Sequence, residues 1–91
     1  MWTIFEKKSL ARSLAKTPIQ IRKQYELWKR IVELEGTQGL RLIKGFRDEA
    51  LKGIWKDHRS SRLSLKWRVI YKVEKKHCEV YVVEVNPHDY N

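Results

Sequence analysis

The chain contains one cysteine, two prolines and four glycines among its 91 residues, and it has no long apolar run. A single cysteine cannot form a disulfide within the chain, and it provides no paired-cysteine motif for zinc or redox chemistry. We therefore expect Cys78 to be a small packing residue. No stretch approaches the roughly 18 apolar residues that cross a bilayer, and residues 1–9 lack the apolar region of a secretion signal. These absences predict a cytoplasmic protein.

Internal repeats and Gly- or Ser-rich linkers are also missing from the sequence. A chain of this length can build one hydrophobic core but not two. Its hydrophobic content of 42% is too high for the disorder that accompanies low hydrophobicity and high charge. We expect residues 1–91 to form a single domain.

Acidic residues are scarce, with 11 Asp and Glu against 20 Lys and Arg, which gives a net charge of +9. Residues 37–73 hold 10 basic and 3 acidic side chains, a net +7, whereas residues 74–91 hold 2 and 4, a net −2. A concentrated positive charge favours binding to a polyanion, because Lys and Arg release counterions from phosphates. The alternative is a solvated basic surface that only keeps the protein soluble.

The amino-terminal half predicts a strand followed by two helices. Trp2–Phe5 is a short apolar run, and Glu6–Lys16 repeats apolar residues at helical spacing. Thr17 and Gln20 have the spacing of a capping box, and Gly36 marks the end of the second helix. The apolar stripe of this helix, which we expect to lie in the core, is made of Ile21, Tyr25, Trp28 and Val32.

The carboxyl-terminal half predicts strands. Leu63–Val73 alternates apolar and polar residues, and Cys78–Val85 is rich in β-branched residues, so the two should pair as a hairpin across the turn Glu74–His77. Leu51–His58 is a plausible third strand of this region, and Thr37–Ala50 is interpreted as a loop or short turn. The fold class is therefore α+β, with a small antiparallel sheet of about four strands packed on two amino-terminal helices in the order β-α-α-β-β-β.

A row of cations follows one face of the Leu63–Val73 strand, opposite its apolar face. Residues two apart on a strand repeat every 6.6–6.8 Å or so, which is similar to the phosphate spacing of single-stranded RNA. The sequence thus predicts an RNA-binding row formed by Arg62, Lys66, Arg68 and Lys72.

Few side chains near this row can transfer protons. Cleaving RNA without a metal needs a base for the 2′-OH, a cation for the charge on phosphorus and an acid for the leaving oxygen. Arg68 could supply the cation and either His88 or Glu49 the base, while His58, Tyr90 or a lysine could assist. Each histidine is also compatible with a plain surface position.

Motifs for metals and nucleotides are missing. Asp57–His58 and His88–Asp89 have neither of the usual histidine spacings of a zinc site. Gly36–Gly39 is too short for a phosphate-binding loop and has no Lys-Ser/Thr after it. We therefore expect no cofactor and no metal.

Two segments resemble a known family. Leu51–Val73 contains the pattern Trp-Arg-Val-Ile-Tyr at Trp67–Tyr71, and the tail reads Asn-Pro-His-Asp-Tyr at Asn86–Tyr90. Over essentially its whole length the chain resembles the RelE/ParE superfamily of toxins from bacterial toxin–antitoxin systems, and it is most similar to the RelE and HigB-like branches that cut messenger RNA. Relatives often have the His and Tyr of the tail adjacent, whereas Asp89 separates them here.

The resemblance implies roles for particular residues. By position it implicates Arg68, His88, Tyr90 and His58 in catalysis, with Glu49 as a weaker match. The residues expected to contact RNA are Arg59, Arg62, Lys66, Lys52, Lys72 and Trp55. An aromatic such as Trp55 could stack on a base or belong to the core.

The function that the resemblance implies is that of a type II toxin. Such a protein would enter the ribosomal A site and cleave messenger RNA by attack of a 2′-OH on the adjacent phosphate, as a metal-independent endoribonuclease that inhibits translation. A cognate antitoxin is the implied protein partner, with no membrane and no small-molecule cofactor. Two alternatives remain open, a ParE-like inhibitor of DNA gyrase and a basic RNA- or ribosome-binding module without catalysis.

Overall fold

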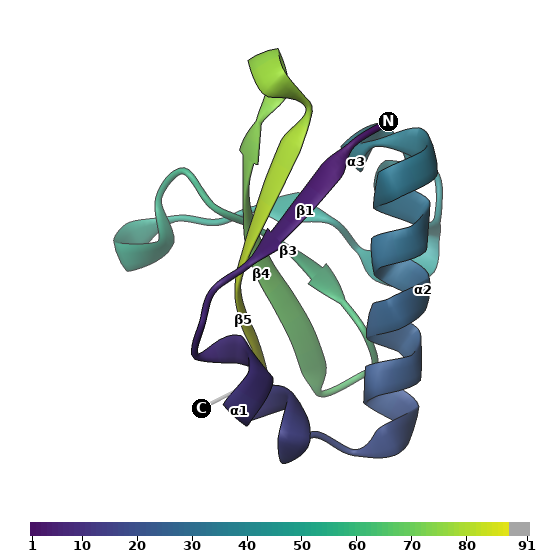
Figure 1. Ribbon diagram of the computed structural model, residues 1–91, viewed down its shortest axis with the longest axis vertical. Coiled ribbons are helices and arrows are strands. Elements are labelled where there is room, and N and C mark those ends of the chain that lie inside the picture. The colour runs from purple at the N-terminus through teal and green to yellow at the C-terminus, as the bar shows by residue number, and fades with distance from the viewer. Residues whose placement is uncertain (88–91) are drawn as a thin grey trace.

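The computed structural model describes residues 1–87, and its elements form one sheet with helices (Figure 1). Three short 3₁₀ turns cover Lys44–Phe46, Gly53–Trp55 and Lys75–His77. The helices are α1 (Leu10–Ala15), α2 (Ile19–Glu35) and α3 (Thr37–Arg41). The strands are β1 (Thr3–Glu6), β2 (Glu49–Ala50), β3 (Arg59–Arg62), β4 (Trp67–Glu74) and β5 (Glu79–Pro87). Within residues 1–87, no helix is both long enough and apolar enough to cross a bilayer.

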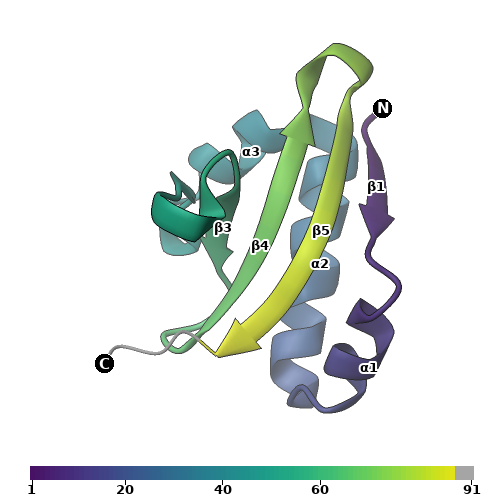
Figure 2. The ribbon, with the colours of Figure 1, turned by 90° about the vertical axis from the view of Figure 1, so that its left-hand side faces the viewer.

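The sheet has five strands in the order β1-β5-β4-β3-β2. The pairs β2·β3, β3·β4 and β4·β5 are antiparallel, whereas β1 joins the edge of β5 in parallel (Figure 2). The predicted α+β class and the hairpin across the turn before Cys78 are confirmed. The sheet differs in two ways from the expected antiparallel sheet of about four strands. It contains an additional two-residue strand, β2, and its strand β1 is parallel to β5.

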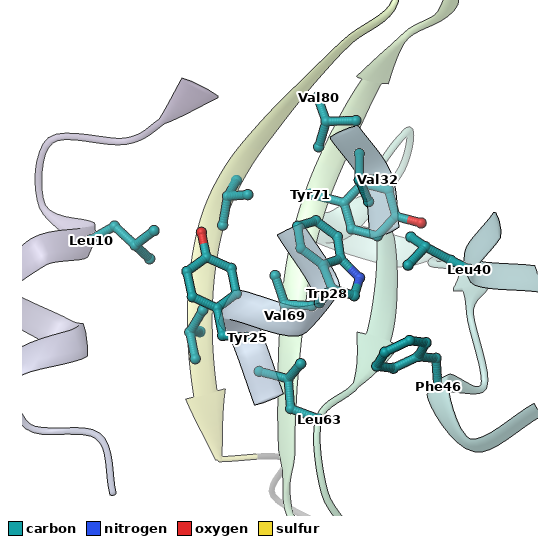
Figure 3. Close-up of a cluster of buried hydrophobic side chains, with 12 residues drawn as sticks. Leu10, Tyr25, Trp28, Val32, Leu40, Phe46, Leu63, Val69, Tyr71 and Val80 are labelled. Carbon is teal, nitrogen blue, oxygen red and sulfur yellow. The ribbon is translucent and has the colours of Figure 1, made fainter. Parts of the chain in front are cut away.

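Helix α2 covers one face of the sheet and supplies the largest core residues (Figure 1). Tyr25, Trp28 and Val32 are fully buried, and they lie against Val69 and Tyr71 of β4 (Figure 3). The edge of Tyr71 packs on Trp28 with the ring centroids 5.2 Å apart. Burial of each large side chain contributes about 1.5–3 kcal/mol, so this stripe, as predicted, fixes α2 on the sheet.

Thr17 does not cap α2, contrary to the predicted capping box. The helix begins at Ile19 after Pro18, which makes no side-chain cap. The Thr17 hydroxyl instead donates a hydrogen bond to the Ser13 carbonyl oxygen at 2.8 Å, and Thr17 is buried. The reason is that α1 ends two residues before Thr17, and the Ser13 carbonyl in its last turn accepts the Thr17 hydroxyl as well as the Lys16 amide.

Two predicted strands were wrong. Leu51–His58 is not a strand, because Gly53 has a φ of +69° and starts a 3₁₀ turn. The run Leu63–Val73 is not one strand either, because the Leu63 amide donates to the Trp67 carbonyl oxygen at 2.8 Å and closes a turn. The alternation of apolar and polar residues in the sequence therefore includes the turn between β3 and β4 as well as the strand β4.

One irregularity in β5 sets which residues face the helices. Tyr71 pairs with Val82 but the preceding residue of β4, Ile70, pairs with Glu84, so Val83 is an extra residue in β5. Such a β-bulge shifts the alternation of a strand by one residue. Val82 and Val85 both face the core as a result. We call the opposite side of the sheet, away from α2, the outer face.

Cys78 is exposed rather than packed in the core, so that prediction was wrong. It has a φ of 54° directly after the 3₁₀ turn Lys75–His77. The reversal between β4 and β5 carries this residue beyond the edge of the core. The turn itself was predicted correctly.

Gly36 links α2 to α3 in a conformation that other residues rarely adopt. Its φ is +73° and its ψ is −173°, and a Cβ built there would lie 2.5 Å from Trp2 Nε1. We expect Gly36→Ala to lower the free energy of unfolding by about 1–3 kcal/mol, measured by urea denaturation. Gly45→Ala is the control, since a Cβ at Gly45 would meet nothing within 4 Å. Equal losses in the two variants would contradict this account.

Candidate active site

Two arginines face each other on the outer face of the sheet. In the β3·β4 register Arg62 pairs with Arg68, and both side chains are half-buried. The sequence had placed Arg62 and Lys66 in one row with Arg68 on a single strand, and the hairpin shows that this row was wrong. The chain reversal instead brings Arg62 across from Arg68, while Lys66 lies exposed in the turn.

The paired arginines line a cavity of about 260 Å³. Glu49 of β2 reaches the same cavity because it pairs with Ser60, and Ser60 lies on the outer face two residues before Arg62. Arg47 adds a third guanidinium from the turn before β2. The full lining is Arg47, Glu49, Ser60, Arg62, Leu65, Trp67 and Arg68. Three arginines and one glutamate thus line one hollow.

Arg68 is oriented by the neighbouring strand. Its Nε donates a hydrogen bond to Asn86 Oδ1 at 3.3 Å, and the Asn86 amide in turn donates to the Glu84 carboxylate. A guanidinium held through Nε keeps its planar edge of Nη groups in a fixed direction. Asn86 belongs to the tail motif of the sequence, where nothing assigned it a role. The register of β4 and β5 pairs Asn86 with Arg68 and so reveals this role. That register cannot be derived without knowing the position of the bulge in β5.

Arg59 lies on the other side of the sheet from this cavity and has a partner there. Its Nη2 is 2.8 Å from Asp48 Oδ2, and the Asp48 side chain has no exposed surface. Burial lowers the pKa of Arg59, but the hydrogen bond and charge of Asp48 outweigh it, so the pKa is raised overall. This geometry favours a structural role for Arg59 over the expected contact with RNA.

Asp48 is also bound by two hydroxyls. Ser61 donates to Asp48 Oδ1 at 2.8 Å, and Tyr71 donates to the same oxygen. Trp28 Nε1 of α2 donates to Ser61 Oγ at 2.9 Å. Burial, followed by the charge of Asp48, raises the pKa of Tyr71, so its hydroxyl stays a donor. This network fixes β3 and the start of β2 against the core.

His58, Trp55 and Lys52 belong to the segment between β2 and β3, which projects away from α2 (Figure 1). The rings of Trp55 and His58 pack edge to face, with their centroids 5.4 Å apart. His58 Nδ1 also lies 3.1 Å from the Lys56 carbonyl oxygen. None of these residues lines the cavity of Arg62 and Arg68.

The remaining expected site residues have these positions. Lys72 is exposed on the outer face of β4, four residues beyond Arg68. His88 and Tyr90 lie outside the described residues, so their expected roles stay predictions. Across residues 1–87, no three His, Cys, Asp or Glu side chains form a group that could hold a metal ion.

The fold and the cavity together define a small α+β protein with an arginine-lined hollow on the open face of its sheet. Several solved structures share this fold. RelE in the archaeal RelE–RelB complex from Pyrococcus horikoshii OT3 has a TM-score of 0.78 and 22% identity, covering 99% of this chain and 98% of that one. YafQ from E. coli strain BL21(DE3) has a TM-score of 0.76 and 16% identity, covering 96% of this chain and 93% of that one. A YoeB/ParE toxin from Agrobacterium tumefaciens has a TM-score of 0.73 and 16% identity, covering 96% of this chain and 99% of that one.

The chain therefore has the fold of the RelE/ParE toxins, and the resemblance noted in the sequence is confirmed at the level of fold. No protein-family model matches the sequence, and neither does any curated protein. Identities of 16–22% show the shared fold and leave the activity to be argued from the site.

Proposed function

We propose that the protein is the toxin of a type II toxin–antitoxin system and that it cleaves messenger RNA on the ribosome as an endoribonuclease. The main support is the cavity in which Arg62, Arg68 and Glu49 converge. A cation pair suits the phosphate, and a carboxylate beside it suits proton removal from the 2′-OH. The fold shared with RelE, YafQ and a YoeB/ParE toxin agrees with this proposal.

In the proposed reaction, the 2′-oxygen attacks the adjacent phosphorus while the bond to the 5′-oxygen breaks. This gives a 2′,3′-cyclic phosphate and a 5′-OH. Negative charge grows on the phosphate oxygens, and Arg68 stabilises it through two parallel N–H donors. Arg62 faces Arg68 from the next strand and adds positive charge at the same place.

Glu49 is the proposed base, because its carboxylate is the acidic group of the described cavity lining. His58 lies outside that lining. The acid that protonates the 5′-oxygen is proposed to come from His88 or Tyr90, as the family resemblance implies. RNA contacts by the exposed Lys52, Lys66 and Lys72 are part of the same proposal.

Glu49→Gln tests the base. The amide has nearly the shape of the carboxylate but cannot accept the 2′-OH proton, so we expect cleavage to slow by about 10²- to 10⁴-fold. Binding of RNA should not weaken, because a negative charge near the phosphate is removed. Cleavage rates in ribosome complexes programmed with a defined message would show this. An unchanged rate would assign proton removal to another group.

Inducing the protein in growing cells tests the proposed activity as a whole. Primer extension on a translated message should show new 5′ ends at codon-spaced positions. Growth arrest with intact messages and induction of the DNA-damage response would instead support the gyrase-inhibitor alternative.

The proposal includes an antitoxin partner and action in the cytoplasm, where ribosomes are. The P. horikoshii RelE structure is a complex with RelB, which is consistent with such a partner. Coexpression with the product of a neighbouring gene should restore growth and yield a complex that copurifies with this chain.

A further inference from the structure

An exposed aromatic pair lies on the outer face of the sheet, away from the arginine cavity. Phe5 of β1 and Tyr81 of β5 are register partners, and their rings are stacked at 5.1 Å between centroids and 14° between planes. Their exposed fractions are 42% and 40%. The neighbours Val80 and Val82 face the core. Large apolar side chains are thus kept at the surface while the adjacent positions are buried.

The Tyr81 ring is fixed in place. Its hydroxyl donates a hydrogen bond to Glu79 Oε1 at 2.7 Å, and this bond raises the pKa of Tyr81. The ring is therefore neutral, and it loses little conformational freedom if a ligand packs on it. A rigid, exposed aromatic surface is the element that proteins use to stack unpaired nucleic-acid bases.

The pair is aligned with the proposed active site. Lys72 is the register partner of Tyr81, and Arg68 is the register partner of Asn86 further along the same two strands. Four residues of a strand span about 13 Å, so Lys72 follows Arg68 by about two phosphate steps of an extended RNA strand. Both side chains point to the outer face.

The two strands differ in charge on this face. The outward residues of β4 include the cations Arg68 and Lys72 and end with Glu74, whereas those of β5 include the acidic residues Glu79 and Glu84 together with Tyr81 and Asn86. The Glu84 carboxylate would repel a phosphate, so an RNA backbone is favoured over β4 and its bases over β5. In that orientation a base would reach the aromatic pair.

We propose that Phe5 and Tyr81 form a stacking site for an unpaired RNA base, about two nucleotides from the phosphate that Arg68 contacts, with Lys72 binding the backbone beside that base. This inference rests on the proposed RNA-cleaving function and assigns a subsite to it. Cross-strand stacking alone would only hold β1 on β5, and the experiment must separate these two roles.

The experiment measures binding of short single-stranded RNA by fluorescence anisotropy at low salt. The RNA carries a 2′-O-methyl group at the expected cleavage position, so it binds without being cut. We expect Phe5→Leu to weaken binding by about tenfold, which corresponds to about 1.4 kcal/mol. Leucine keeps an apolar contact with Tyr81 but has no aromatic face. Leu34→Ala is the control, because Leu34 is an exposed apolar residue of α2 on the other side of the sheet, and this variant should bind RNA as the unmodified protein does.

An RNA with one abasic nucleotide separates stacking from stability. If the base stacks on the pair, removing it two positions from the cleavage site weakens binding to the unmodified protein, and Phe5→Leu then causes no further loss. Equal losses on intact and abasic RNA, or no loss with Phe5→Leu, would overturn the stacking site. So would failure of the unmodified protein to bind RNA at low salt.

Failure of the proposed function has a different signature. If messages stay intact in cells and ribosome complexes while Phe5→Leu weakens binding only to RNA that has the base, the stacking site stands without the nuclease. If cleavage is observed and depends on Arg68 but the abasic RNA binds normally, the nuclease stands without the stacking site.

Discussion

Replacing Arg68 with alanine is expected to slow RNA cleavage by about 10²- to 10³-fold and to relieve the growth arrest that the unmodified protein causes. The reason is that Arg68 is the arginine oriented by Asn86 towards the cavity shared with Glu49. The side chain is half-buried on the outer face and outside the hydrophobic core, so the variant should fold. Rates in programmed ribosome complexes and primer extension in cells measure the effect.

Arg68→Lys is the matched control, because it keeps the charge but loses the planar pair of donors. We expect an intermediate rate, closer to that of the alanine variant. Asn86→Ala should lower the rate less and leave RNA affinity nearly unchanged, since it only orients Arg68. Growth arrest that persists in Arg68→Ala without new 5′ ends would favour the binding module that lacks catalysis.

Replacing Asp48 with alanine is expected to lower the free energy of unfolding by about 3–5 kcal/mol, the cost of breaking a buried ion pair. The variant leaves the Arg59 guanidinium without its carboxylate and removes the acceptor of Ser61 and Tyr71. In a chain of this size the midpoint of thermal unfolding should fall by roughly 10 °C or more. Thermal and urea unfolding followed by circular dichroism would measure both quantities.

Glu26→Ala is the control for Asp48→Ala. Glu26 pairs with Lys29 at 2.8 Å, the same distance as in the Arg59–Asp48 pair, but its side chain is 68% exposed. Water screens an exposed pair, so we expect a loss of about 1 kcal/mol or less. Similar losses in both variants would show that burial of the Asp48 network has no special weight.

The sequence predicted the parts of the fold whose stability comes from repeated apolar burial. The stripe of Tyr25, Trp28 and Val32 has the period of a helix, and Gly36 ends that helix as expected. The hairpin of β4 and β5 was predicted because both strands are rich in β-branched residues. In these elements the local pattern and the tertiary packing favour the same structure.

Strand β3 could not be predicted in the same way, because its residues are polar. Ser60 and Ser61 carry no β-strand pattern, and Ser61 is buried through hydrogen bonds with Trp28 and Asp48 that join distant parts of the chain. A polar strand of this kind depends on partners that no short sequence window contains. The boundary between β3 and β4 was missed for the same reason.

The sequence predicted individual site residues better than their arrangement. Arg68 and Glu49 were both named, and the structure brings them to one cavity, whereas His58 lies apart from it. Arg47 and Asn86 had no predicted role, because their proximity to Arg68 depends on strand register. Residue type indicates which chemistry is available, but pairing across strands decides which groups act together.

The bulge at Val83 makes β5 a strand of two halves that are out of phase with each other. If the same nine residues alternated without a bulge, Val85 would turn towards water and Asn86 towards the core. The extra residue therefore keeps Val85 in the core and Asn86 beside Arg68. Orientation of Arg68 thus depends on the bulge in the neighbouring strand as well as on the composition of that strand.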